Sequence, residues 1–164
     1  PEKDEMFITK GQLLQDIMVS LGGRIAEEII FGDITTGASS DIKKATSAAR
    51  DMVTRYGMSE NIGVINYNSD DDEVFIGRDL AHAKNHSELI SGEIDREVKA
   101  IIDDCYKKAK DIILAHMDVL HHCAELLIVK EKIGREEFEA LFDQKENDPE
   151  SFFENHEIGE SAQK

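Results

Sequence analysis

Asp41 is the residue of this 164-residue chain whose setting most directly suggests chemistry. It follows the loop Thr35-Thr36-Gly37-Ala38 and two serines, Ser39 and Ser40, which are good N-caps for a helix. An aspartate in the first turn of a helix interacts favourably with the helix dipole, by about 0.3–1 kcal/mol, and the spacing alone favours this structural role. A carboxylate at this position could also point out of the helix end and bind a cation, but one carboxylate does not make a metal site.

Histidine is the other residue type here that is able to hold a metal. His82 and His86, two of the six histidines, have the i, i+4 spacing that shares a helix face. Their surroundings resemble a loop and no third ligand has suitable spacing, so we do not predict a metal site from them. His121-His122 near a predicted helix start indicates a surface position.

The zinc motif H-E-x-x-H is absent from the sequence. His156 is followed by glutamate, but the run 156–160 ends in glutamate instead of histidine. There is also no P-loop G-x-x-x-x-G-K-[ST] and no G-x-S-x-G nucleophile elbow. Cys105 and Cys123 form no C-x-x-C pair and fall within apolar helical patterns, so we expect buried thiols in a reducing compartment. No catalytic residue is assigned.

Two helices are predicted to position Asp41. Apolar residues recur every three or four positions from about residue 11 to 30, after the capping-box pair Thr9 and Gln12. Gly22 and Gly23 within this helix suggest close approach of another backbone. The second helix starts at the serines before Asp41, and Gly57 is placed to end it as the C′ residue.

The rest of the chain is predicted to be mainly helical with a small β-hairpin. A long helix starts near Ser87 or Ser91, and shorter helical segments follow Asp118 and Gly134. The β-prone runs 64–67 and 74–76 flank a polar turn, which predicts a two-stranded hairpin. The apolar stripe of the long helix contains Ile90, Ile94, Val98, Ile101, Cys105, Ala109 and Ile112.

Composition supports a soluble, helix-rich chain, with 40% apolar and 33% charged residues and no tryptophan. The formal net charge of −16 argues against binding to nucleic acid or to an anionic membrane surface. No apolar run approaches the roughly 18–20 residues that span a bilayer. Residues 145–164 are polar and acidic, and we expect a disordered tail after a domain over 1–144. The chain starts at Pro1 without methionine, so we expect a piece of a longer protein.

Several blocks of sequence together carry a resemblance. They are Leu21-Gly22-Gly23-Arg24-Ile25-Ala26-Glu27-Glu28-Ile29-Ile30-Phe31-Gly32, Thr36-Gly37-Ala38-Ser39-Ser40-Asp41-Ile42, Ala45-Thr46, Ala49-Arg50-Asp51-Met52-Val53-Thr54, Tyr56-Gly57-Met58-Ser59, Val74-Phe75-Ile76-Gly77-Arg78-Asp79 and Ile94-Asp95-Arg96-Glu97-Val98. In this order they resemble the FtsH family of ATP-dependent AAA zinc metalloproteases. The resemblance covers nearly the whole chain up to residue 142 and implies a helical bundle like the C-terminal part of that family's peptidase domain.

In that family two histidines of an H-E-x-x-H helix and a later aspartate hold the zinc. The resemblance therefore implies that Asp41 is the third zinc ligand, although Ser40 stands where the family usually has asparagine. The H-E-x-x-H helix lies upstream of the matching region in the family, so this chain is predicted to be inactive alone. Glu27 or Glu28 on the adjacent helix is either support for a ligand or part of a solvated face.

For the whole protein the resemblance implies a membrane-anchored homo-hexamer in a bacterial cell, with its peptidase domain on the cytoplasmic side. It would degrade unfolded or mis-assembled proteins in quality control, using Zn²⁺ together with ATP and Mg²⁺ in an AAA module. Membrane anchoring would come only through an N-terminal part that is missing here, and this piece would be soluble. The alternative is a non-catalytic helical oligomerisation module without peptidase ancestry, which the long apolar stripe would also suit.

Overall fold

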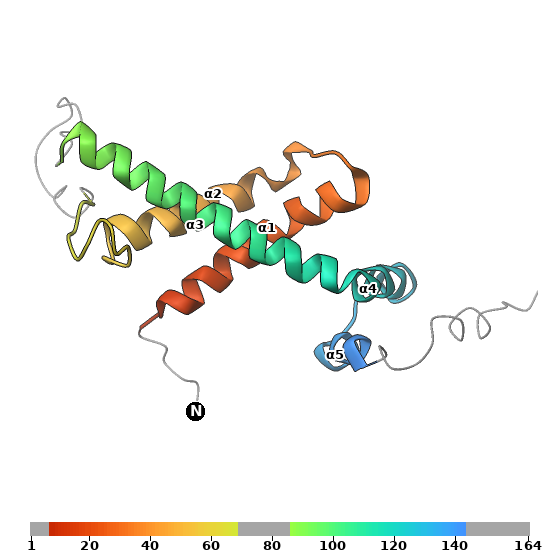
Figure 1. Cartoon of the computed structure of the whole chain (residues 1–164). Coiled ribbons are helices and arrows are strands. Elements are labelled where there is room, and N and C mark those ends of the chain that lie inside the picture. The colour runs from red at the N-terminus through yellow and green to blue at the C-terminus, as the bar shows by residue number, and fades with distance from the viewer. Residues whose placement is uncertain (1–6, 69–85, 144–164) are drawn as a thin grey trace, which may run out of the picture. The chain divides into compact units, whose positions relative to one another are not determined.

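The computed structural model describes residues 7–68 and 86–143. Within these ranges the chain is helical, in the order α1, the 3₁₀ turn η1, α2, α3, α4 and α5 (Figure 1). The chain divides into two compact units, Pro1–Ile113 and Leu114–Lys164. The mainly α prediction is confirmed.

Helix α1, Lys10–Phe31, is defined by signals at both ends. Thr9 and Gln12 form the predicted capping box, which satisfies donors of the first turn. Gly32 ends the helix with a φ of 63°, a left-handed conformation that glycine adopts without the steric cost of a Cβ. The predicted helix is therefore confirmed to within one residue at each end.

Helix α2, Ser39–Thr54, begins differently from the prediction. Ser39 and Ser40 lie inside the helix, its N-cap is Ala38, and no side chain caps it. The 3₁₀ turn η1, Thr36–Ala38, leads directly into α2 and is capped by the Thr35 hydroxyl. The serines were wrong as caps because this turn brings the chain into a helical conformation before it reaches them.

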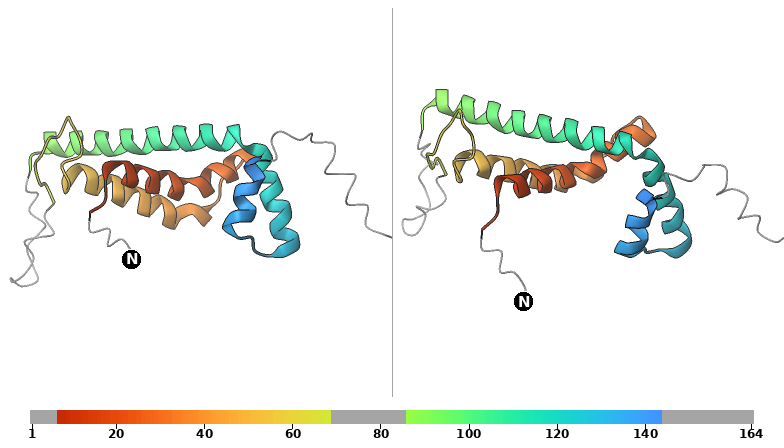
Figure 2. Two further views of the ribbon diagram at one scale, coloured as in Figure 1. Left: turned by 90° about the horizontal axis from the view of Figure 1, so that it is seen from below. Right: turned by 60° about the horizontal axis from the view of Figure 1, so that its bottom comes forward.

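Helix α3, Glu88–Ala115, completes the core of the first unit. It crosses α1 and α2 (Figure 1) and lies on one side of them (Figure 2). Polar contacts join it to the segment after α2, because the Glu97 carboxylate accepts hydrogen bonds from Ser59 and Asn61, both at 2.6 Å. The largest fully buried side chains among the described residues come from all three helices: Ile17, Ile25, Met52, Val53, Ile94 and Cys105.

The second unit contains α4, Met117–Lys130, and α5, Arg135–Asp143. Glu131 ends α4 in a left-handed conformation, with a φ of 63°. Phe142 packs edge-on against Phe138 and His116, with ring centroids 5.4 and 5.3 Å apart. Both short helices follow the predicted segments, but Asp118 lies in the first turn of α4 and His116 is the N-cap.

The β-hairpin prediction is not supported. Residues 64–67 form no strand, and residues 74–76 lie outside the described part of the chain. The backbone N–H of Tyr67 instead donates to Thr54 O at 2.7 Å. This donor therefore satisfies a carbonyl at the end of α2, not a neighbouring strand.

Three smaller predictions also need correction. A Cβ built on Gly22 or Gly23 meets no atom within 4 Å, so no backbone approaches them closely in the described structure. Gly57 adopts a left-handed φ of 61°, as a residue that ends a helix should, but it lies two positions beyond the C-cap. Cys105 is buried as expected, whereas Cys123 is partly exposed on α4.

Candidate metal centre

Asp41 lies in the first turn of α2 with 43% of its side chain exposed. Its Oδ1 atom contacts Lys44 Nζ at 3.5 Å, the long limit of a hydrogen bond. A carboxylate has about four lone-pair positions, so this contact leaves most of them available. Asp41 is therefore able to act as an oxygen ligand without breaking a strong interaction.

A hydrogen-bonded relay precedes Asp41. The Thr35 hydroxyl donates to Glu27 Oε1 at 2.6 Å, and the Thr35 backbone N–H donates to Glu27 Oε2 at 3.4 Å. The same hydroxyl oxygen accepts the Gly37 N–H at 3.1 Å. Glu27 on α1 is thus tied to the loop that leads into α2.

Glu28, the next residue, is directed to a different neighbour. It accepts a hydrogen bond from the Tyr106 hydroxyl and one from Lys110 Nζ at 3.0 Å, both on α3. The Tyr106 hydrogen bond, followed by that of Lys110, lowers the pKa of Glu28. Glu27 and Glu28 thus each connect α1 to another segment.

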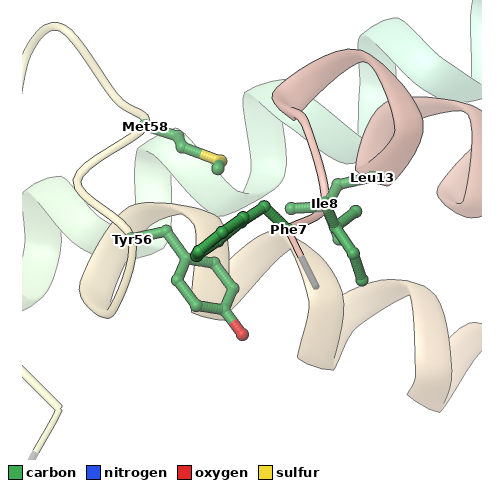
Figure 3. A pocket seen from close by; sticks show the side chains of 5 residues that line it. All are labelled: Phe7, Ile8, Leu13, Tyr56 and Met58. Carbon is green, nitrogen blue, oxygen red and sulfur yellow. The ribbon is translucent and has the colours of Figure 1, made fainter. Parts of the chain in front are cut away.

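Two hollows lie at opposite ends of the α1–α2 pair. One of about 540 Å³ lies near Asp41 and is lined by Arg24, Ile34, Thr35, Thr36, Ser39 and Ile42. The other, of about 280 Å³, is mainly apolar and is lined by Phe7, Ile8, Leu13, Tyr56 and Met58 (Figure 3). It lies at the start of α1 and beyond the end of α2, so it is not part of the Asp41 site.

No histidine-containing metal cluster forms around Asp41 in the part of the chain that the structure describes. Among residues 7–68 and 86–143, no three His, Cys, Asp or Glu side chains come close enough together to hold a metal ion. His86 instead packs edge-on against Tyr67, with ring centroids 5.4 Å apart. His82 and His156 lie outside the described residues.

Sequence reasoning missed the partners of the two glutamates. Glu27 and Thr35 are separated by the end of α1, and Glu28 and Tyr106 are 78 positions apart. Neither pair follows a helical or strand period, so only the blocks of family resemblance drew attention to this stretch.

Comparison with known proteins decides the ancestry. Residues 1–141 match Peptidase family M41. The chain belongs to this family. An oligomerisation module without peptidase ancestry is thereby excluded.

M41 relatives resemble the chain over most of its length. It is 48% identical over 141 residues to the ATP-dependent zinc metalloprotease FtsH of Caldicellulosiruptor bescii, covering 86% of this chain and 23% of the relative. The ATP-dependent zinc metalloprotease FtsH of Thermotoga maritima is 40% identical, with the same coverages. FtsH 3 of Petrotoga mobilis is 42% identical over 94% of this chain and 24% of its own length. The chain thus spans less than a quarter of the length of these relatives.

Within residues 7–68 and 86–143, no single helix is long and apolar enough to span a membrane. Helices α3 and α4 meet the length and composition criteria only when they are taken together as a bent pair.

We predict that Tyr106→Phe reduces the loss of stability at alkaline pH. Burial, and then the hydrogen bond to Glu28, raises the pKa of Tyr106 from 10.0 to about 12. A folded-state pKa above the unfolded value gives stability that is complete below pH about 10 and is lost as the pH rises towards about 12. Urea unfolding from pH 9 to pH 12 would measure this loss, with Tyr56→Phe as the control because Tyr56 is 47% exposed. Equal pH dependence in both variants would contradict the prediction.

Proposed function

We propose that this chain is part of the peptidase domain of an ATP-dependent zinc metalloendopeptidase, and that Asp41 is its third zinc ligand. The supporting observation is the placement of Asp41, a half-exposed carboxylate in the first turn of α2 with only a long contact to Lys44 Nζ on its Oδ1. Membership of Peptidase family M41 supports a metal-binding role for that carboxylate.

The donor chemistry of Asp41 fits zinc as one ligand of a set. Carboxylate oxygen is an ordinary zinc ligand, and a catalytic zinc has three protein ligands and one open position. The other two are proposed to be imidazoles of an H-E-x-x-H helix, which the sequence does not contain. When bound, zinc would polarise the scissile carbonyl and lower the pKa of the attacking water.

In the proposed reaction, this chain supplies and positions the zinc ligand Asp41. No proton transfer is assigned to residues of this chain. Helices α1 and α3 pack against α2 through the buried core. This packing holds in place the helix that carries Asp41. Because both histidines of the H-E-x-x-H motif, and its glutamate that would act as the general base, are missing from the sequence, the chain by itself is proposed to be inactive.

For the whole protein, the names of the relatives support an ATP-dependent protease. We propose that it uses ATP and Mg²⁺ in an AAA module, assembles as a homo-hexamer and is anchored in the bacterial cell membrane with its peptidase domain on the cytoplasmic side. Its proposed substrates are unfolded or mis-assembled proteins, in membrane and cytoplasmic quality control.

Casein hydrolysis tests whether this chain is inactive by itself and needs the longer protein for activity. The purified chain should show no cleavage above background, whereas the longer protein that contains it should cleave casein in an ATP-dependent manner that a zinc chelator abolishes. Chelator-sensitive cleavage by the pure chain would contradict the proposal, because it would require a complete active site within residues 1–164.

A further inference from the structure

The hollow of about 540 Å³ adjoins Asp41. Ser39 and Ile42, which precede and follow Asp41 in the first turn of α2, both line it. Ile34 and Ile42 give it apolar walls, since they are 56% and 36% exposed. Among the six residues that line the hollow, only Arg24 of α1 is charged. The hollow thus places an arginine beside the residue that we propose as a zinc ligand.

Arg24 has an unpaired hydrogen-bond donor. Its Nη1 atom is buried and makes no hydrogen bond within the part of the chain that the structure describes. Burial removes water as an alternative partner, and buried polar groups in folded proteins are paired in the great majority of cases. A guanidinium also stays protonated, so it cannot become neutral to reduce the cost of burial. The unpaired donor therefore favours an acceptor that comes from outside these residues.

The acidic side chains nearest to Arg24 in the sequence already have other donors. Glu27 accepts the Thr35 hydroxyl at 2.6 Å. Glu28, one turn after Arg24 on α1, accepts hydrogen bonds from two side chains of α3. The Nη1 atom of Arg24 is hydrogen-bonded to neither carboxylate. The hollow beside it is where an additional acceptor can enter.

The charges around the hollow favour a neutral acceptor over an anion. After the hydrogen bonds from Tyr106 and Lys110, and the charge of Lys110, the charge of Arg24 also lowers the pKa of Glu28. Glu27 and Glu28 on α1 provide two negative charges, which offset those of Arg24 and Lys110. A ligand carboxylate would add a further negative charge, whereas a peptide carbonyl offers an acceptor oxygen without one.

We infer that the hollow binds the main chain of a peptide substrate, with Arg24 Nη1 donating a hydrogen bond to a carbonyl oxygen of that chain. This inference rests on the proposed function, because it requires that peptide substrates reach Asp41. Each residue of a peptide carries a carbonyl acceptor, so the contact does not depend on the substrate's side chains. It suits unfolded substrates, whose carbonyls are not paired within helices or sheets.

Steady-state cleavage of an unstructured peptide by the longer protein tests the inference. Arg24→Met removes the donors, and should raise KM by about 10–100-fold, the usual range for a hydrogen bond to a charged group. The value of kcat should stay within about 3-fold, because the contact is present both before and during the reaction. Arg24→Lys retains a charged donor and should recover part of the loss.

Arg50→Met is the matched control. Arg50 is an exposed arginine of α2 that pairs with Asp95 at 3.1 Å, and it does not line the hollow. Its replacement should leave KM unchanged. An unchanged KM in Arg24→Met with normal zinc content would overturn the inference. A rise in KM confined to peptides with acidic side chains would also overturn it, since the partner of Arg24 would then be a carboxylate.

A change in the substrate tests the same contact on the original protein, whose folding is not disturbed. An ester in place of an amide makes the carbonyl a weaker acceptor. In a series of peptides with one ester each, outside the scissile bond, one position should raise KM several-fold. The same ester should have a smaller effect in Arg24→Met, because both changes remove one contact. A series without such a position, or with equal effects in both proteins, would contradict the inference.

The two proposals fail in different ways. If cleavage requires zinc and Asp41 but KM is unchanged in Arg24→Met, the carbonyl site is wrong and the proposed function stands. If Asp41→Asn binds zinc and cleaves peptides as the original protein does, the ligand assignment is wrong, and so is the substrate site that rests on it.

Discussion

Asp41→Asn in the longer protein is expected to weaken zinc binding and casein hydrolysis by more than about 100-fold, because changes to residues that only support a ligand already cost about 10–100-fold. Asparagine keeps the size of the side chain but removes the negative charge and one of the two carboxylate oxygens. Zinc content after dialysis and the rate of casein cleavage measure the effect.

The control for this variant is Asp103→Asn. Asp103 is an exposed aspartate of α3 that pairs with Lys99 one turn away, and such surface pairs contribute little. It should leave zinc content and cleavage unchanged. A fully loaded, active Asp41→Asn protein would contradict the assignment of Asp41.

Ile25→Ala is expected to destabilise the chain by about 2–5 kcal/mol, the usual cost of removing a large aliphatic side chain from a packed core. Ile25 is fully buried between α1 and its neighbours, so the deletion removes apolar contacts and leaves a cavity. The free energy of unfolding in urea measures the loss.

Val19 on the same helix provides a comparison, because it is 80% exposed. Val19→Ala should change stability by no more than about 0.5 kcal/mol, as for most surface substitutions. A similar cost for the two substitutions would show that the packing around Ile25 does not hold α1 in place.

Local signals explain why the helices were predictable. The bounds of α1 depend on Thr9, Gln12 and Gly32, whose capping and left-handed conformations are encoded within a few residues. The apolar stripe of α3 identified the buried positions Ile94 and Cys105, because a helix presents every third or fourth residue to the same face. The stripe also included Ile112, which is 57% exposed and is not part of the core.

Tertiary contacts explain what the sequence could not predict. Val64 and Ile65 are β-prone, yet this segment bonds to the end of α2 through Tyr67 and forms no strand. Strand propensity depends on a pairing partner, which local sequence does not specify. Gly22 and Gly23 likewise suggested close packing, whereas the described structure places no atom near a Cβ at either position.

The candidate site was predictable only in part. Periodicity placed Asp41 at the start of a helix, but its role as a ligand came from the family resemblance. The partners of Glu27 and Glu28 became visible only with the fold, since each hydrogen bond joins residues from different elements. The 3₁₀ turn before α2 was missed for the same reason, because Thr35 caps it while held by Glu27.

Zinc titration calorimetry on the purified chain, compared with Asp41→Ala, tests whether Asp41 belongs to a zinc site that residues 1–164 do not complete. We expect no tight binding to either protein, because Asp41 is proposed to be one ligand of a set whose two imidazoles are not in this sequence. Tight 1:1 binding that Asp41→Ala abolishes would contradict the account, since residues 1–164 would then contain a complete zinc site.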